Sequence, residues 1–413
     1  MAKLVRTRWR REPKDAGGGT AGRSALFGAM FLMATSAIGP GFITQTATFT
    51  AQLGAAFAFA ILVTVLIDIA VQMNVWRVVG VSGLHAQDIA NRVLPGAGYV
   101  LAGLVVAGGL VFNIGNVAGT SLGLDALLGL EPRLGGALSA VIAIGIFLSR
   151  RAGVVMDRVV IVLGFAMIAL TLYVAVISDP PVGEALRQTV LPDEISFLVL
   201  TTLIGGTVGG YITYAGAHRL LDSGVAGPAD VGRIARSSVT GIVITGVMRV
   251  VLFLAVLGVV AGGATLASDN PPASAFFQAA GEVGLRLFGV VLWAAAISSV
   301  IGASYTSVSF LKTFSPAIAR REGWAIGAFI TVSALVFVAV QQPPVTLLVF
   351  AGALNGLILP FGFGVLLWAA VRRRDLLGDY RYPVWLLVIG ALAWALTVYM
   401  GYASLEGLSK LWA

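Results

Sequence analysis

The hydrophobic residues of this chain occur in long runs, separated by short segments that carry most of the charge. A helix that crosses a bilayer needs about 20 mostly apolar residues, because each residue rises about 1.5 Å across a core of roughly 30 Å. Eleven runs fit this description, and the fourth is the shortest. We therefore predict spanning helices at 25–52, 54–79, 96–123, 134–149, 153–178, 195–221, 232–262, 284–312, 323–340, 343–371 and 382–404.

Basic residues are distributed unevenly between the two sides that these spans define. With the N-terminus in the cytoplasm, 22 of the 27 Lys and Arg fall on the inner side. Outside lie only Arg133, Arg187, Arg286 and Lys410, and Arg249 is within a span. Inner loops are enriched in Lys and Arg, so the charge pattern predicts a cytoplasmic N-terminus and an outer C-terminus. Residues 1–22 are predicted to form a flexible basic tail, and the location suggests a prokaryotic inner membrane.

The composition of the chain argues against several classes of function. Hydrophobic residues make up 58% of the chain and charged residues 11%, whereas soluble domains carry about 25% charged residues. The chain has no cysteine and only two histidines, His85 and His218, which argues against an enzyme, a thiolate site or a zinc site. The net charge of +8 is explained by basic residues that flank the spans, so no nucleic-acid partner is expected.

Two spans are interrupted near their middle. The first contains Ser-Ala-Ile-Gly-Pro-Gly-Phe at 36–42, and the sixth contains Gly-Gly-Thr-Val-Gly-Gly-Tyr at 205–211. Proline removes a backbone donor and glycine is a poor helix former, so both helices are expected to unwind there. Matching interruptions in two halves of a chain point to a transporter's substrate site, whereas a channel favours rings of charges or carbonyls. Close helix packing is the alternative explanation for these glycines.

Several segments resemble the NRAMP family of divalent-metal transporters, which belong to the APC superfamily. They are Met-Ala-Thr-Ser-Ala-Ile-Gly-Pro-Gly-Phe at 33–42, Gly-Leu-His-Ala-Gln-Asp-Ile-Ala at 83–90, Asn-Ile-Gly-Asn-Val-Ala-Gly at 113–119, Gly-Thr-Val-Gly-Gly-Tyr at 206–211 and Leu-Pro-Phe at 359–361. The resemblance implies an all-α membrane protein of the LeuT fold, with broken helices 1 and 6. The two inverted five-helix repeats would occupy 23–178 and 194–372, and an eleventh helix would lie in 381–413.

The metal ligands of that family are missing from the matching positions. In the family an Asp and an Asn of the first span, a Met of the sixth and a Gln of the tenth hold the metal. The matching residues are Gly39, Phe42, Gly209 and Gly352. Divalent cations need oxygen, nitrogen or sulfur ligands, so the family's site is lost. An alternative alignment moves the first break to 43–46, which also supplies no carboxylate.

The family's proton-linked residues are also replaced. Its acids of the third span match Asn113 and Asn116, and its histidine of the sixth span matches Tyr211. Helix N-termini bared by glycine favour an anion, and residues 38–43 are similar to the break that receives a carboxylate in amino-acid transporters of the same superfamily. We interpret the chain as a secondary-active symporter of a small carboxylate-bearing solute, such as an amino acid, an organic acid or a 5-oxoproline-like compound. The alternative is a divalent cation (Mn, Mg or Fe) bound in a non-standard site.

Two groups of residues are candidates for this function, although each member could equally be a packing residue. The predicted substrate-binding residues are Gly39, Pro40, Gly41, Phe42, Thr44, Gln45, Gly209, Gly210, Tyr211, Tyr214 and Asn355. The predicted coupling or gating residues are Asp68, Arg249, Asn113, Asn116, Ser298, Ser299 and His218. Asp68 and Arg249 are charges within spans, which are functional candidates because their burial is costly, and they could also pair structurally. We expect no resident metal or cofactor, coupling to H⁺ or Na⁺, a lipid bilayer as surroundings, and a monomer.

Overall fold

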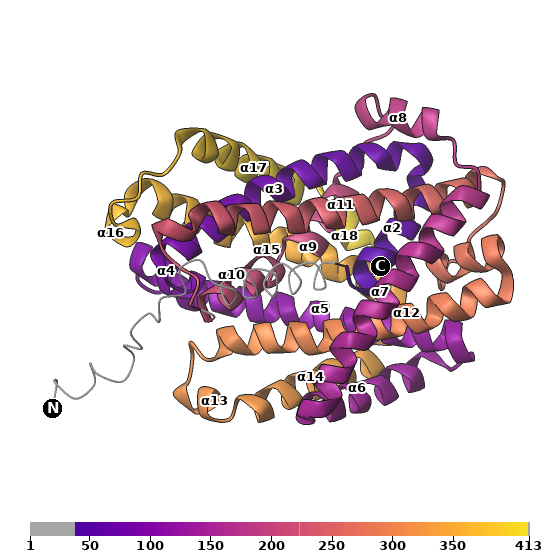
Figure 1. Cartoon of the computed structure of the whole chain (residues 1–413), viewed down its shortest axis with the longest axis horizontal. Coiled ribbons are helices and arrows are strands. Elements are labelled where there is room, and N and C mark those ends of the chain that lie inside the picture. The colour runs from indigo at the N-terminus through magenta and orange to yellow at the C-terminus, as the bar shows by residue number, and fades with distance from the viewer. Residues whose placement is uncertain (1–37, 223, 412–413) are drawn as a thin grey trace.

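The structure is a computed structural model that describes residues 38–222 and 224–411, in which every regular element is a helix. Four long helices, α3 (Phe57–Ser82), α5 (Ala97–Leu128), α11 (Val231–Ala261) and α12 (Pro271–Leu311), run along the length of the bundle (Figure 1). The shorter α9 (Phe197–Thr207) and α10 (Ile212–Asp222) lie between them. The all-helical architecture predicted from the apolar runs is confirmed.

Further helices complete the bundle on either side of the long ones. They are α2 (Pro40–Leu53), α4 (Ala86–Val93), α6 (Pro132–Leu148), α7 (Arg150–Ile177), α8 (Val182–Val190), α13 (Pro316–Arg320), α14 (Glu322–Val340), α15 (Pro344–Arg372), α16 (Arg374–Leu377), α17 (Val384–Ala403) and α18 (Leu405–Lys410). Short 3-10 turns at Gly54–Ala56 and Pro228–Asp230 precede α3 and α11.

Each predicted span from the second to the eleventh contains a helix, but the count of eleven stays a prediction. Within the described residues, eight segments are long and apolar enough to cross a membrane, or nine if the pair α7 and α8, bent by 104°, is one span. That count joins α2 to α3 and treats α9 and α10 as one segment, and it leaves out the 17-residue α6 as short. The predicted tail and the first half of the first span lie outside the described residues, and the division into two repeats stays a prediction.

One local expectation is wrong, and the structure adds helical segments that were not predicted. The alternative first break at 43–46 is wrong, because these residues are helical within α2. The eighth span was predicted to begin at 284, and a further helical segment precedes it: α12 starts at Pro271 and kinks at Gly281, whose φ of 63° lies outside the helical region, so the helix after the kink begins close to the predicted start. The short helices α4 and α8 were not predicted, because their mean hydropathy is low and their length is below that of a span.

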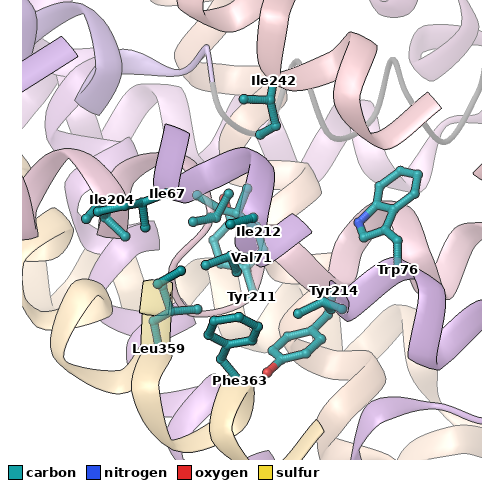
Figure 2. Packing of buried hydrophobic residues seen from close by; sticks show 14 of the residues in the cluster. Ile67, Val71, Trp76, Ile204, Tyr211, Ile212, Tyr214, Ile242, Leu359 and Phe363 are labelled. Atoms are coloured by element: carbon teal, nitrogen blue, oxygen red, sulfur yellow. The ribbon is translucent and has the colours of Figure 1, made fainter. Parts of the chain in front are cut away.

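The broken sixth span occupies the centre of the protein. In its apolar segment 89% of the residues are buried, against 28% in α14, so α9 and α10 are enclosed by protein while α14 faces outward. Figure 2 shows how Ile204 and Ile212 on the two sides of the break pack among apolar side chains of α3 and α15. Unwound backbone at membrane depth requires such enclosure, because lipid offers no hydrogen-bond partners.

Candidate functional site

The first interruption exposes the start of α2. Gly39 adopts an extended conformation (φ −100°, ψ −172°), and no side chain of the described residues caps the helix that follows. Pro40 has no N–H, packs against Gly119 and begins the helix, so the first free backbone donors are those of Gly41 and Phe42. These donors, together with the positive end of the helix dipole, favour a negatively charged or electron-rich group.

The second interruption separates α9 from α10 at residues 208–211, where the sixth span was predicted to break. Gly210 has a φ of +51°, and a Cβ at this position would overlap Oδ1 of Asn355. A Cβ on Gly209 would lie 2.5 Å from the Cα of Gly205 and 2.8 Å from the carbonyl oxygen of Asn355. A Cβ on Gly209 would therefore face backbone, and the assignment of Gly209 to the substrate site stays a prediction.

A polar cluster surrounds the start of α2, and we define it as Gly39, Asn116, Tyr211 and Ser299. A Cβ built on Gly39 would lie 2.9 Å from Oγ of Ser299 and 3.9 Å from Oδ1 of Asn116. The Tyr211 hydroxyl lies close to Asn116 without forming a hydrogen bond of acceptable geometry. Both amide atoms of Asn116 and the hydroxyls of Tyr211 and Ser299 are buried without a hydrogen-bond partner. Such groups are costly to bury, which makes this cluster a candidate ligand site.

The polar cluster is bordered by aromatic rings and by the side chain of Gln45. Phe112 meets Tyr211 edge to face at 5.5 Å, and its ring lies beside Gly41. The amide of Gln45 donates to the carbonyl of Leu348 over 3.0 Å, while its Oε1 is buried without a partner. Thr44, one residue earlier, is fully buried and its hydroxyl also has no partner.

Gln45 occupies space that two glycines leave open. A Cβ on Gly206 would lie 2.7 Å from Oε1 of Gln45, and one on Gly352 would lie 2.5 Å from its Nε2. Gly352 is the position that matches the tenth-span Gln of the NRAMP pattern. An amide is therefore present in this region after all, carried by α2 instead of α15.

Other predicted residues hold helices together away from the polar cluster. Asn113 donates to Ser304 and Ser333, over 3.0 Å each, and thereby links α5 to α12 and α14. Asn355 donates to the carbonyls of Gly108 and Ala351 beside the second break, and its Oδ1 lies against Gly210. These contacts support a packing role for Asn113 and a role in shaping the break for Asn355.

The side chains of Ser298 and Ser299 face different surroundings. The hydroxyl of Ser298 donates to the carbonyl of Ala295 in its own helix, which is the usual behaviour of serine in membrane helices, whereas Ser299 faces Gly39. Tyr214 also lies apart from the polar cluster, where its ring contacts those of His218 and Phe310. Figure 2 shows Tyr214 beside Phe363, between α10 and α15.

The two charges within spans do not form a contact ion pair. Asp68 on α3 is 2% exposed and accepts a hydrogen bond of 2.5 Å from Thr207, the last residue of α9. Arg249 on α11 is 1% exposed, and its guanidinium lies 4.3 Å above the ring of Phe42. Among the described residues, the ion pairs within 4.0 Å do not include Asp68 with Arg249, although the two interact at longer range.

Sequence reasoning missed two features of this region. Thr207 was treated only as part of a glycine-rich break, yet it connects that break to Asp68. His85 was considered only as one of the two histidines of the chain, yet its ring meets His218 edge to face at 4.6 Å. Nε2 of His218 also accepts from the backbone N–H of Ala86, which holds α4 against α10. The signal available for the second feature was that the chain contains only these two histidines.

An apolar groove of about 420 Å³ lies elsewhere, between α3, α8 and α11. Its lining is apolar except for Thr189, and side chains such as Leu62 and Val247 remain exposed along it. Such a surface is what lipid chains contact, and it offers no polar group to orient a polar substrate. The groove is therefore a poorer candidate for the substrate site than the polar cluster.

The polar cluster presents neutral donors and acceptors. No group of three or more His, Cys, Asp or Glu within 38–222 and 224–411 is arranged to hold a metal ion. A site of amide and hydroxyl groups at a helix N-terminus fits a carboxylate, which accepts hydrogen bonds, better than a dehydrated divalent cation, which needs several oxygen ligands and usually a carboxylate.

Comparison with known sequences gives matches over nearly the whole chain. A family described as natural resistance-associated macrophage protein-like (Nramp) matches residues 30–406. The membrane protein YcsG of Bacillus subtilis, described as uncharacterized, is 54% identical and covers 97% of this chain and 99% of its own length. An uncharacterized membrane protein of Haemophilus influenzae is 53% identical and covers 92% of this chain and 95% of its own length.

Comparison with solved structures supports the LeuT fold that the resemblance to the NRAMP family implied. A manganese transporter of Eremococcus coleocola superposes with a TM-score of 0.73 at 17% identity, covering 95% of this chain and 88% of the transporter. MhsT in complex with L-phenylalanine superposes with a TM-score of 0.60 at 15% identity, covering 91% of this chain and 98% of MhsT. These likenesses show a LeuT-like arrangement of helices.

Proposed function

The chain belongs to the Nramp family of membrane transporters, with a LeuT-like fold, and we propose that it is a secondary-active transporter of a small carboxylate-bearing solute. The observation that carries this proposal is the polar cluster at the start of α2. Its partnerless amide and hydroxyl groups lie beside a helix N-terminus, where an anionic group is favoured. An amino acid, an organic acid or a 5-oxoproline-like compound has the required carboxylate.

Transport by alternating access is supported by the burial of the polar cluster. Asn116 and Tyr211 are 0% exposed and Ser299 is 3% exposed, so a solute reaches them only when neighbouring elements move. The half-helices α2, α9 and α10 end at the two breaks, and the breaks are natural points for such movement. We propose that α2 and α10 move relative to α5 and α12 to open the site.

A divalent metal cation is the second candidate substrate, and the comparisons favour it over the first. The structural neighbours from Eremococcus coleocola are manganese transporters. In addition, Asp68 supplies a buried carboxylate at the end of α9, where the negative end of a helix dipole favours a cation. The neutral chemistry of the polar cluster argues against this candidate, because the carboxylate lies outside that cluster.

The coupling ion and the membrane orientation belong to the same proposal. Asp68 is the candidate for proton coupling, because it is a buried ionisable group that contacts a broken helix. Ser299 is the candidate for Na⁺ coupling through its hydroxyl oxygen. We propose a bacterial plasma membrane as the location, with the N-terminus in the cytoplasm, on the charge distribution of the loops.

The deciding experiment compares ligands by thermal unfolding of the purified full-length protein. Mn²⁺, Mg²⁺, Na⁺, acetate, L-alanine and L-5-oxoproline are each titrated, since a ligand that binds the folded state raises its stability with concentration. Saturable stabilisation by a carboxylate supports the first candidate if the affinity for that ligand falls at least about tenfold in Ser299→Ala. A hydroxyl that contacts a charged ligand is worth about 1.5–3 kcal/mol. Saturable stabilisation by Mn²⁺ that Asp68→Asn abolishes supports the second and refutes the first.

A matched control comes from the same helix. Ser309 donates only to the carbonyl of Thr306 within α12, so Ser309→Ala removes a hydroxyl without touching the polar cluster. The ligand responses of the Ser309→Ala variant are expected to equal those of the unaltered protein. Uptake of the stabilising ligand into liposomes, with a pH or Na⁺ gradient imposed separately, then measures transport and identifies the coupling ion.

A further inference from the structure

We propose that Arg249 binds the carboxylate of the transported solute side-on, through Nε and Nη2 of its guanidinium. This inference rests on the proposed function, and it deepens that function by naming the residue that selects an acid over its neutral relatives. Arg249 comes from the middle of α11, a helix that contributes no residue to the polar cluster.

The location of Arg249 is unusual for a positive charge. Its side chain is 1% exposed, and the guanidinium lies 4.3 Å above the ring of Phe42, which belongs to the first turn of α2. The attraction between the guanidinium and the ring is small against the cost of burying a charge. The guanidinium also lies near the positive end of a helix dipole. The burial of the charge and its position near the positive end of the dipole are both unfavourable unless an anion is present nearby.

The described residues do not provide that anion in contact. Asp68 interacts with Arg249 only beyond ion-pair distance, and its Oδ2 accepts the hydrogen bond from Thr207. Nε and Nη2 of Arg249 are both buried and have no hydrogen-bond partner. A buried charge usually has a partner, so a partnerless one within a transporter indicates a group that receives a ligand.

The identity of the two partnerless atoms specifies the ligand. Nε and Nη2 lie on the same edge of the guanidinium, and their N–H bonds point in parallel. The two oxygens of a carboxylate accept such a pair of bonds together, which gives a planar two-point contact. A neutral amide presents one acceptor oxygen and a donor NH₂ group, so it satisfies only one of the two N–H groups.

The test compares acids with their neutral relatives on the purified full-length protein. Thermal-shift titrations pair acetate with acetamide and L-5-oxoproline with 2-pyrrolidinone, each a carboxylate with an uncharged relative. The unaltered protein is expected to bind at least one acid more than tenfold tighter than its neutral relative. Arg249→Gln is expected to weaken the binding of that acid by at least about 30-fold, because one partner of a buried charge pair is lost. The affinity for the neutral relative is expected to stay within about threefold.

Two further variants separate binding from folding. Arg249→Lys keeps the charge and most of the volume but lacks the paired N–H groups, so the ratio of acid to neutral affinity is expected to fall severalfold in a folded protein. Arg286→Gln on α12 removes an arginine that donates to the carbonyls of Ala126 and Leu127, and it is expected to leave the ratio unchanged.

The outcomes distinguish this inference from the proposed function. If the unaltered protein shows no preference for any acid, both fail. If it prefers an acid and Arg249→Lys keeps the full preference, only the role of Arg249 is overturned. If Arg249→Gln does not fold, Arg249→Lys decides, because a charge needed only for stability would leave the ratio of acid to neutral affinity intact.

Discussion

The hydroxyl of Thr207 donates a 2.5 Å hydrogen bond to Asp68, and this bond joins the last residue of α9 to the middle of α3. Oδ1 of the same carboxylate is buried without a partner. A change in the charge of this carboxylate alters the hydrogen bond at the end of α9, next to the break. The bond is therefore a structural link between an ionisable group and the break at which α10 is proposed to move.

Removing this link is expected to destabilise the protein. Thr207→Val keeps the shape of the side chain but deletes the donor, and the loss of a buried hydrogen bond to a carboxylate costs about 1–2 kcal/mol. The measurement is the free energy of unfolding in detergent. Thr64→Val is the control, because Thr64 on α3 donates only to carbonyls of its own helix. Equal stability of the two variants would contradict a special role for the Thr207 bond.

The second break is expected to tolerate only glycine at position 210. Gly210→Ala places a Cβ at a φ of +51°, which costs about 1–2 kcal/mol, and adds the overlap with Asn355. We expect a clear drop in the thermal midpoint. Gly145→Ala is the matched control, since that helical position is open, and it is expected to be neutral or stabilising. An unchanged midpoint for Gly210→Ala would mean that the break is not rigid.

Charge in the polar cluster is expected to reverse its ligand preference. Asn116→Asp introduces a carboxylate beside Gly39 and Ser299, so carboxylate ligands are repelled at neutral pH and a response to Mn²⁺ appears. Acidification protonates the aspartate and is expected to restore the carboxylate response. Asn91→Asp is the control, because Asn91 accepts from the N–H of Gly98 and an aspartate preserves that bond. Thermal-shift titrations at two pH values make the measurement.

The contact between α4 and α10 is expected to weaken in acid. Nε2 of His218 accepts from the N–H of Ala86, and an acceptor nitrogen carries no proton, so the bond exists when His218 is neutral and is lost on protonation. Hydrogen exchange at Ala86 is predicted to accelerate as the pH falls through the titration of His218. His218→Gln, whose amide oxygen accepts at every pH, should exchange at a rate that follows only the intrinsic chemistry.

The orientation in the membrane is directly testable because the chain has no cysteine. Single variants Arg320→Cys and Lys410→Cys are labelled in intact cells with a membrane-impermeant thiol reagent. The charge distribution predicts labelling of the variant at 410 before lysis and of the variant at 320 only after it. The reverse result would invert the proposed topology.

Much of this protein was determined by local properties of the sequence. Long apolar runs specify helices in a membrane, because lipid leaves backbone groups no partner outside the helix, and Pro40 and Gly210 mark the breaks through their own backbone preferences. The sequence alone also shows that the residues of the two breaks include no carboxylate. These conclusions need only neighbouring residues along the chain.

The tertiary structure decided which side chains meet, since that depends on the rotation and depth of each helix. It placed Asn116 and Ser299 beside Gly39 but kept Asn113 in a packing contact three residues away, and it turned Gly209 toward backbone. It also left Asp68 and Arg249 apart although their sequence depths are similar. Positions three apart on a helix differ by about 60° in direction and about 4.5 Å in depth, so Asn113 and Asn116 meet different surroundings that no local pattern specifies.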